Sequence, residues 1–212
     1  MSLSLQRPSE VEPPKRQAIL DAATELFTAH GYGAVSMDAI ARAANVSKAT
    51  LYAHFRSKDE LFATIIREAC QSNLAAREFL PQEDGDVRAA LTRLAGRMLR
   101  FLLEDRSLAI HRVVIAESVR FPELGRAFFE SGPLMFSAAF GAWLTEQTEA
   151  GRLSVADPAQ AADQFAGMLK CGCYTRAALG VSPAPSEAEI DHTVSGAVET
   201  FLKAYAATAS QD

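Results

Sequence analysis

Apolar residues recur along this chain at spacings of three and four, which is the period of an amphipathic helix. β-branched and aromatic residues are scattered, and no segment alternates with a period of two. The pattern therefore predicts an all-α protein. Gly, Pro and capping residues divide it into expected helices over 13–30, 58–80, 86–104, 107–119, 122–130, 133–150, 157–179 and 186–207, with two short helices between 36 and 58.

The two short helices are predicted to be joined by a tight turn. Ser36 and Ser47 each stand where a helix cap is needed, and Asn45 tolerates the left-handed conformation that ends a helix. Leu51 and Phe55 can point into a small core, which leaves the opposite face of the second helix toward solvent or a DNA duplex. This arrangement is typical of a helix-turn-helix, in which the second helix enters the major groove.

The segment resembles the DNA-binding domain of TetR/AcrR-type transcriptional regulators over roughly the first 65 residues. Several spaced positions agree at once: Ala18 to Ala23, Leu26, Phe27, Gly31, Tyr32, Ile40, Ala41, Ala44, Val46, Ser47, Thr50 to Tyr52, His54, Phe55 and Lys58. The family usually has Gly where this chain has Asn45, a change that preserves the turn. Further on, Arg120 to Gly125 is similar to the regulatory domain of the AefR-like subset.

The resemblance implies which residues contact DNA. At the start of the second helix, Ser47 would lie at the DNA surface, and Lys48, Ala49 and Thr50 would face base edges. Tyr52 and His54 would contact phosphates or a thymine methyl group, and Lys58 would bind a phosphate. Backbone N–H groups would be offered to the opposite DNA strand by Ser36 and Met37. The first helix would either add phosphate contacts or carry a solvated charge pair through Lys15 and Arg16.

Charge is distributed unevenly along the chain. The net charge is −5, yet six basic and three acidic residues between Pro13 and Lys58 give that segment +3. The remainder is therefore strongly acidic. This asymmetry concentrates phosphate affinity in one small domain.

We expect three parts: a flexible arm over 1–12, a three-helix helix-turn-helix domain over 13–58, and a helical ligand-binding and dimerisation domain over 59–212. The helix from Lys58 leaves the first domain and joins the second, so it is the expected lever between them.

The larger domain carries more bulky residues than a thin helical bundle needs. Core packing accounts for any one of them, but together they favour a cavity for a small hydrophobic or aromatic effector. The candidates are Met98, Phe101, Leu102, His111, Ile115, Phe136, Phe140, Trp143, Met168 and Tyr174. His111 and Arg112, near Glu117, could supply polar groups, although a His satisfied within its helix is the alternative.

The last two expected helices carry small residues at close spacing, which allows helices to approach closely. These residues are Ala162, Ala166, Gly167, Cys171, Gly172, Ser195, Gly196 and Ala197. They predict a four-helix bundle across a two-fold axis, and hence a homodimer.

Enzymatic chemistry is poorly supported. Glu189 and His192 have a di-metal ligand spacing, but the second copy that such a site needs is absent. Cys70, Cys171 and Cys173 are odd in number and include no Cys-x-x-Cys pair, so we expect reduced thiols. Cys171 and Cys173 fall on different helix faces, which argues against a shared metal, and we expect no cofactor. No apolar run is long enough to span a membrane and no signal peptide is evident, so we expect a cytoplasmic protein.

The resemblance to TetR/AcrR-type regulators implies a ligand-responsive transcriptional regulator, a repressor that binds a near-palindromic double-stranded DNA operator as a homodimer. The alternative is a helical ligand carrier that retains the DNA domain without regulatory use. Sequence-specific DNA binding distinguishes the two.

Overall fold

The computed structural model describes residues 13–74 and 86–207. The helices are α1 (Pro13–His30), α2 (Met37–Ala43), α3 (Lys48–His54), α4 (Lys58–Leu74), α6 (Val87–Leu103), α7 (Asp105–Glu117), α8 (Pro122–Ser131), α9 (Pro133–Glu149), α10 (Pro158–Leu169), α11 (Cys173–Ala178) and α12 (Glu187–Tyr205). Extended pairing within the described residues is limited to one isolated bridge between Leu153 and Ala206. The predicted all-α class is confirmed. The expected arm over 1–12 and the expected helix end near residue 80 lie outside the described residues.

Local capping sets the helix-turn-helix. Ser36 Oγ accepts from the N–H of Ala39, and Ser47 Oγ accepts from the N–H of Thr50 at 3.0 Å, so both predicted caps are present. Between the two helices Asn45 has φ 53°, the left-handed conformation predicted for this turn. These contacts satisfy N–H groups that a helix start leaves free and so fix the angle between α2 and α3.

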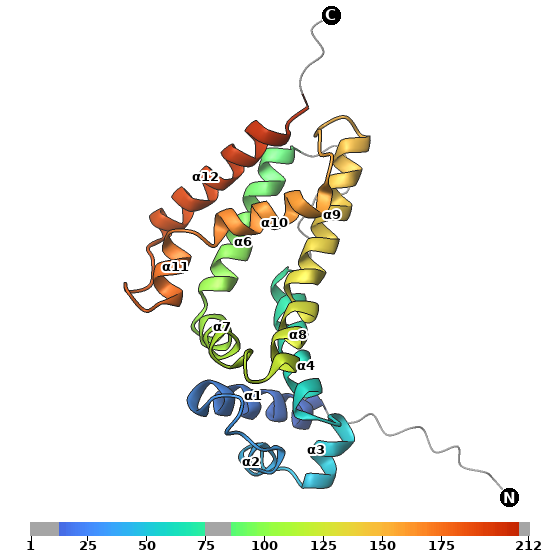
Figure 1. Cartoon of the computed structure of the whole chain (residues 1–212), viewed down its shortest axis with the longest axis vertical. Coiled ribbons are helices and arrows are strands. Elements are labelled where there is room, and N and C mark those ends of the chain that lie inside the picture. The colour runs from blue at the N-terminus through green and yellow to red at the C-terminus, as the bar shows by residue number, and fades with distance from the viewer. Residues whose placement is uncertain (1–12, 75–85, 208–212) are drawn as a thin grey trace, which may run out of the picture.

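The small N-terminal domain has a core built from α1, α2, α3 and the first half of α4. Phe27, Tyr32 and Phe62 form an aromatic cluster with ring centroids 5.3 to 5.9 Å apart. The core does not stop at these helices, because buried Ile110 and Val114 of α7 belong to the same cluster, as does Leu124 of α8. The domain therefore rests on α7 and α8, as Figure 1 shows.

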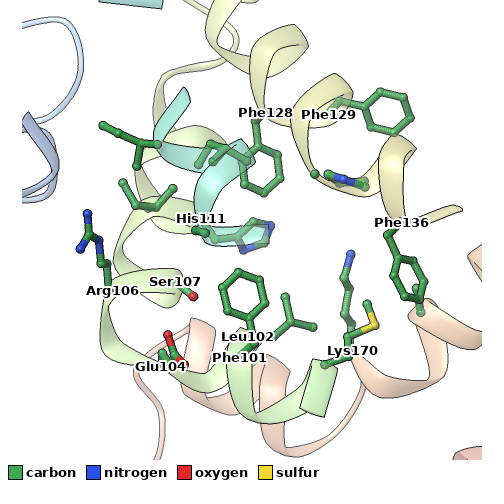
Figure 2. Close-up of a pocket in the computed structure, with 18 of the residues that line it drawn as sticks. Phe101, Leu102, Glu104, Arg106, Ser107, His111, Phe128, Phe129, Phe136 and Lys170 are labelled. Carbon is green, nitrogen blue, oxygen red and sulfur yellow. The ribbon is translucent and has the colours of Figure 1, made fainter. Parts of the chain in front are cut away.

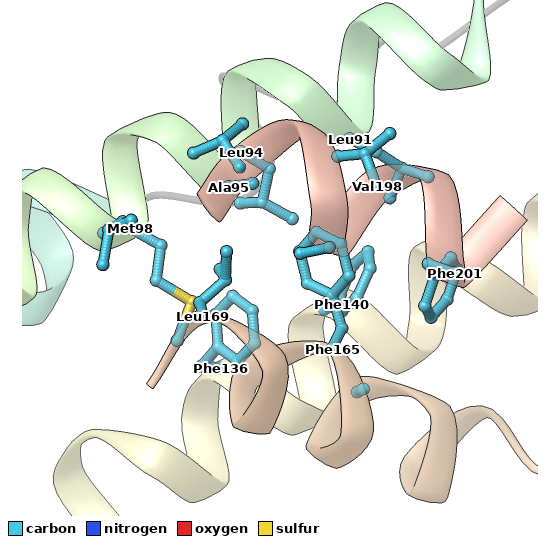
Figure 3. Close-up of a cluster of buried hydrophobic side chains, with 14 of the residues drawn as sticks. Leu91, Leu94, Ala95, Met98, Phe136, Phe140, Phe165, Leu169, Val198 and Phe201 are labelled. Atoms are coloured by element: carbon cyan, nitrogen blue, oxygen red, sulfur yellow. The ribbon is translucent and has the colours of Figure 1, made fainter. Parts of the chain in front are cut away.

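The larger domain packs α6, α9, α10 and α12 around a second core. Phe140 of α9 is fully buried, with its ring 5.1 Å from Phe165 and 6.1 Å from Phe201. Figure 3 shows these rings facing Leu91 and Leu94 of α6. Aromatic packing thus joins α9, α10 and α12.

One predicted helix is broken in two. The segment expected to be continuous over 157–179 ends its first helix at Leu169 and starts again at Cys173. Gly172 lies between them with φ 63°, a conformation that glycine adopts without strain. The break redirects α11 toward α7, where Arg112 donates to the carbonyl oxygens of Ala177 and Ala178 at 2.7 and 2.8 Å.

Candidate DNA-binding surface and ligand cavity

The exposed face of α3 carries the residues expected to contact bases. Lys48, Ala49 and Tyr52 are exposed, whereas Leu51 and Phe55 are buried in the core. Tyr52 is 50% exposed, a large value for an aromatic residue on a short helix. Ser47 is also exposed, while Thr50 and His54 are half-buried. The division of α3 into a packed side and a polar side is the one that a groove-binding helix needs.

Lys48 has a partner within the protein. Its Nζ lies 2.5 Å from Asp38 Oδ2 of α2, and both side chains are well exposed. An exposed ion pair of this kind contributes at most about 1 kcal/mol, so a guanine or a phosphate can displace the carboxylate. Sequence reasoning named Lys48 but not its competitor Asp38.

Lys58, expected to hold a phosphate, makes contacts within the protein. Its Nζ donates to the carbonyl oxygens of Tyr32 and Val35 at 2.7 and 2.9 Å, and it lies 4.2 Å from the centre of the Tyr32 ring. Burial lowers the pKa of Lys58, although Asp59, Glu117 and Glu123 oppose that shift. The ammonium therefore links the turn after α1 to the start of α4 by hydrogen bonds. A phosphate contact through its remaining hydrogen stays a prediction.

The other residues that were expected to contact the DNA backbone lie partly at the protein surface and partly against the core. Arg16 is ion-paired with Glu68 of α4 and lies 5.7 Å from the centre of the Phe55 ring. This is the charge-pair alternative, realised within the protein. Lys15 and Ser36 are exposed, and Met37 is half-buried against the core of the small domain.

A cavity of about 640 Å³ opens between the two domains. Six of the ten residues expected at a cavity line it: Met98, Phe101, Leu102, His111, Phe136 and Tyr174. The wall also includes residues that sequence reasoning missed, from α1, α4 and α8, namely Leu20, Ile65, Ile66, Phe128 and Phe129. Figure 2 shows Phe101, Phe128 and Phe136 around the space.

Four of the expected residues do not line this cavity. Phe140 and Trp143 are buried in the core of the larger domain, their rings stacked 5.8 Å apart. Met168 borders a separate groove between α10 and α12. Ile115 is 65% exposed, because it follows the buried Val114 by one residue and is turned about 100° away around the helix axis. This cavity therefore does not extend to Ile115, Phe140 and Trp143, where it was expected.

The polar groups of the cavity are also different from those expected. His111 does face it, and its Nδ1 is 2.8 Å from the hydroxyl of Tyr174. Burial, and secondarily the charge of Lys170, lowers the pKa of His111. Arg112 instead caps α11, and Glu117 binds the small domain, so neither supplies the cavity.

A compact joint connects the cavity helices to the helix-turn-helix. Glu117 Oε2, at the end of α7, accepts from the N–H of Gly33 at 2.7 Å. Phe121 packs edge-on against Tyr32 at 5.6 Å, and the Tyr32 hydroxyl is hydrogen-bonded to Asp59. Burial first, and then the Asp59 carboxylate, raises the pKa of Tyr32. Because α7 also carries Ile110 and His111 of the cavity wall, one helix touches both places.

The small residues of the C-terminal helices separate into two sets. Ala162 and Ala197 are buried in the core of the protomer itself, whereas Gly167, Cys171, Ser195 and Gly196 are exposed. The groove beside them is bordered by Gln164, Gly167, Met168, Cys171, Thr200, Phe201, Ala204 and Tyr205.

Glu189, half of the Glu-x-x-His pair, closes the capping box of α12 with Ser186 and is ion-paired with Arg176.

Two family profiles match the chain. The family described as "Bacterial regulatory proteins, tetR family" matches residues 19–65, and "AefR-like transcriptional repressor, C-terminal domain" matches residues 89–207. The chain belongs to the TetR family. It is accordingly a DNA-binding transcriptional regulator with a helix-turn-helix.

Two known regulators are similar to this chain over nearly its whole length, and a third is similar over a shorter segment. A putative TetR-family regulator from Mesorhizobium loti MAFF303099 is 32% identical, with TM-score 0.78, and the match covers 91% of this chain and 96% of that one. The Flavonoid-responsive Regulator FrrA is 36% identical, with TM-score 0.75, over 93% of this chain and 100% of its own. YhgD of Bacillus subtilis, an uncharacterized HTH-type regulator, is 43% identical over 68 residues, which span 30% of this chain and 36% of YhgD. Within the described residues, none of the helices is both long and apolar enough to cross a lipid bilayer.

Proposed function

We propose that this TetR-family protein is a repressor that binds a near-palindromic operator as a homodimer and leaves it when a small hydrophobic or aromatic effector occupies the cavity. The observation that carries this proposal is the composition of the cavity wall. Leu20 of α1 and Ile65 of α4 belong to the small domain, while Phe101 and Phe136 belong to the larger one. A ligand between them touches both domains at once.

Such a ligand has the means to act on DNA binding. It can change DNA affinity only if it binds two packings of the domains with different affinity. A cavity shared by α1, α4 and α7 is sensitive to how those helices pack, because each supplies part of its wall. Effector and operator would then oppose each other through a single coupling free energy, typically 1–3 kcal/mol.

The DNA-binding part of the proposal rests on α3. Lys48, Ala49 and Thr50 would meet base edges, Tyr52 and His54 the sugar-phosphate backbone or a thymine methyl group, and α2 the opposite strand. Two α3 helices must be separated by about 34–36 Å to enter successive major grooves, and the proposed two-fold dimer through α10 and α12 would have to hold them at that distance. The exposed small residues Gly167 and Gly196 support that interface.

An aromatic effector is supported by the cavity and by one relative. The wall contains Phe101, Phe128, Phe129 and Phe136. FrrA, 36% identical, is described as flavonoid-responsive. The chemistry and the relative point to the same class of compound.

Selection of bound duplexes from a random DNA pool tests the proposal. Recovery of a palindrome would support operator binding, and it would supply the probe for a second measurement. Aromatic compounds are then titrated while operator affinity is followed by fluorescence anisotropy. Failure to enrich any sequence would contradict the proposal and favour a ligand carrier, and enrichment without release by any aromatic compound would remove the effector response.

A further inference from the structure

A lysine side chain extends into the cavity. Lys170 is the residue at which α10 ends, and it is half-buried. Figure 2 shows its ammonium in the space bordered by Phe101, His111 and Phe136. Among the residues that the structure describes, Nζ forms no ion pair and donates no hydrogen bond, either to Asp163 or to the carbonyl oxygens of α10. Burial lowers the pKa of Lys170, against the weaker opposing effect of Asp163.

The other charges at the cavity are already compensated or lie at its edge. Glu68 is paired with Arg16, and Arg106 contacts Asp21 and donates to Thr24 Oγ1 at 2.8 Å. Two carboxylates, those of Glu104 and Asp163, are exposed to solvent. Figure 2 places Glu104 and Arg106 across the view from Lys170. The buried charge that a ligand would meet among the aromatic rings is therefore positive.

Further groups at the cavity favour a negative ligand. Gly132 and Pro133 line the cavity where α9 begins, and that helix start has neither a side-chain cap nor an acidic residue in its first turn. Within the part of the chain that the structure describes, neither a capping side chain nor a first-turn carboxylate therefore compensates the positive end of its dipole. The Tyr174 hydroxyl and the His111 ring, hydrogen-bonded to each other, offer a polar neighbour that carries no negative charge at neutral pH.

We propose that the effector is an organic anion: an aromatic body packed among Phe101, Phe128 and Phe136, with a carboxylate or comparable acidic group bound to the Lys170 ammonium. The inference rests on the proposed effector function and specifies its ligand class. A desolvated ammonium is costly, and an anion placed against it restores the lost interaction. A neutral ligand of the same shape would leave Lys170 unpaired.

Matched pairs of probes test this directly. The full-length protein is titrated by calorimetry with 2-naphthoate and anthracene-2-carboxylate, and with the corresponding neutral amides. A charge-assisted hydrogen bond in a partly buried site predicts that each carboxylate binds about ten- to a hundredfold more tightly than its amide. Lys170→Met keeps the apolar part of the side chain and removes its charge. It should therefore abolish the preference for the carboxylates while still binding the amides. Lys170→Arg should retain the preference.

The outcomes separate the inference from the proposed function. Equal or tighter binding of the amides by the wild-type protein overturns the inference, and this comparison needs no variant to fold. If the amides also release operator DNA, the effector response stands without the anion. If the carboxylates bind in a Lys170-dependent way and operator affinity does not change, the anion site stands and the effector response fails. Absence of binding by every probe overturns the inference, whereas the effector response is decided by the operator titration.

Discussion

The backbone N–H of Gly33 donates a 2.7 Å hydrogen bond to Glu117 Oε2, across 84 positions of sequence. Gly33 precedes the helix-turn-helix, and Glu117 ends the helix that carries His111 into the cavity. The site has no room for a side chain, because an added Cβ at Gly33 would lie 2.7 Å from the Phe121 ring. The joint between the two domains is thus closely packed and hydrogen-bonded.

Glu117→Ala is expected to weaken communication between the cavity and the DNA. Gly33 N–H is near solvent and can bind water instead, so the loss of stability should be small. The ratio of operator affinities with and without effector should fall by about twofold to thirtyfold, which corresponds to 0.5–2 kcal/mol of coupling. Fluorescence anisotropy with a saturating effector measures this ratio. Glu130→Ala, at the exposed end of α8, is the control, and an unchanged ratio for Glu117→Ala would exclude the joint from the coupling.

Local chemistry made part of this structure predictable. Ser36, Ser47 and Asn45 act within three residues of their own positions, so their caps and the turn could be predicted without any knowledge of the tertiary fold. The break at Gly172 was missed because a glycine between two cysteines looks like one more small residue of a packed helix face. Its positive φ becomes evident only once α11 is docked against Arg112.

The cavity was predictable only in part for a similar reason. Helix periodicity identifies inward positions such as Phe101 and Phe136, but not which helices share a wall. Leu20 reaches the cavity because α1 packs against α7, and Ile65 reaches it because α4 packs against α6 and α8. No short segment encodes such long-range packing. Lys170 was missed because a lysine at a helix end is usually solvated.

Replacing Lys48 by alanine and replacing Lys58 by alanine are expected to weaken DNA binding in different ways. If Lys48 donates to guanine acceptors, Lys48→Ala should cost about 1–3 kcal/mol at the operator and relax preference at one base pair per half-site. Lys58→Ala removes two hydrogen bonds to carbonyl oxygens, so the melting temperature should fall and affinity for cognate and random DNA should fall equally. If Lys58 also holds a phosphate, the salt slope should fall by roughly one per contact.

Both variants should be measured on cognate, single-mismatch and random duplexes at several salt concentrations, together with thermal unfolding. Equal losses on every duplex for Lys48→Ala would assign that residue to the DNA backbone and leave base recognition to Ala49, Thr50 and Tyr52. A Lys58→Ala protein of wild-type stability would contradict the structural role of the ammonium.

Asp38→Asn is expected to tighten DNA binding. The carboxylate holds the Lys48 ammonium at 2.5 Å and adds a negative charge to the face that approaches phosphates. Its removal should raise affinity for cognate and random DNA by about twofold to fivefold, with a larger gain at low salt. Stability should fall slightly, because Asp38 lies in the first turn of α2, where a negative charge is favourable. Asp105→Asn, in the first turn of α7, is the matched control, and weaker binding by Asp38→Asn alone would contradict the prediction.

The predicted dimer interface is best tested by two substitutions that introduce the same charge in different surroundings. Ala197 is 5% exposed within the protomer, so Ala197→Glu should disrupt the core and is unsuitable as a test of dimerisation. Gly167 is exposed, and an added Cβ there meets no atom within 4 Å. Gly167→Glu should therefore leave a helical, folded protomer.

If α10 and α12 form the interface, the two copies of the new charge would be desolvated near the two-fold axis. The protein should then be monomeric by sedimentation and bind the operator at least tenfold more weakly. Thr92→Glu, on the exposed face of α6, should remain like the wild type. A Gly167→Glu protein with wild-type dimer stability would place the interface elsewhere.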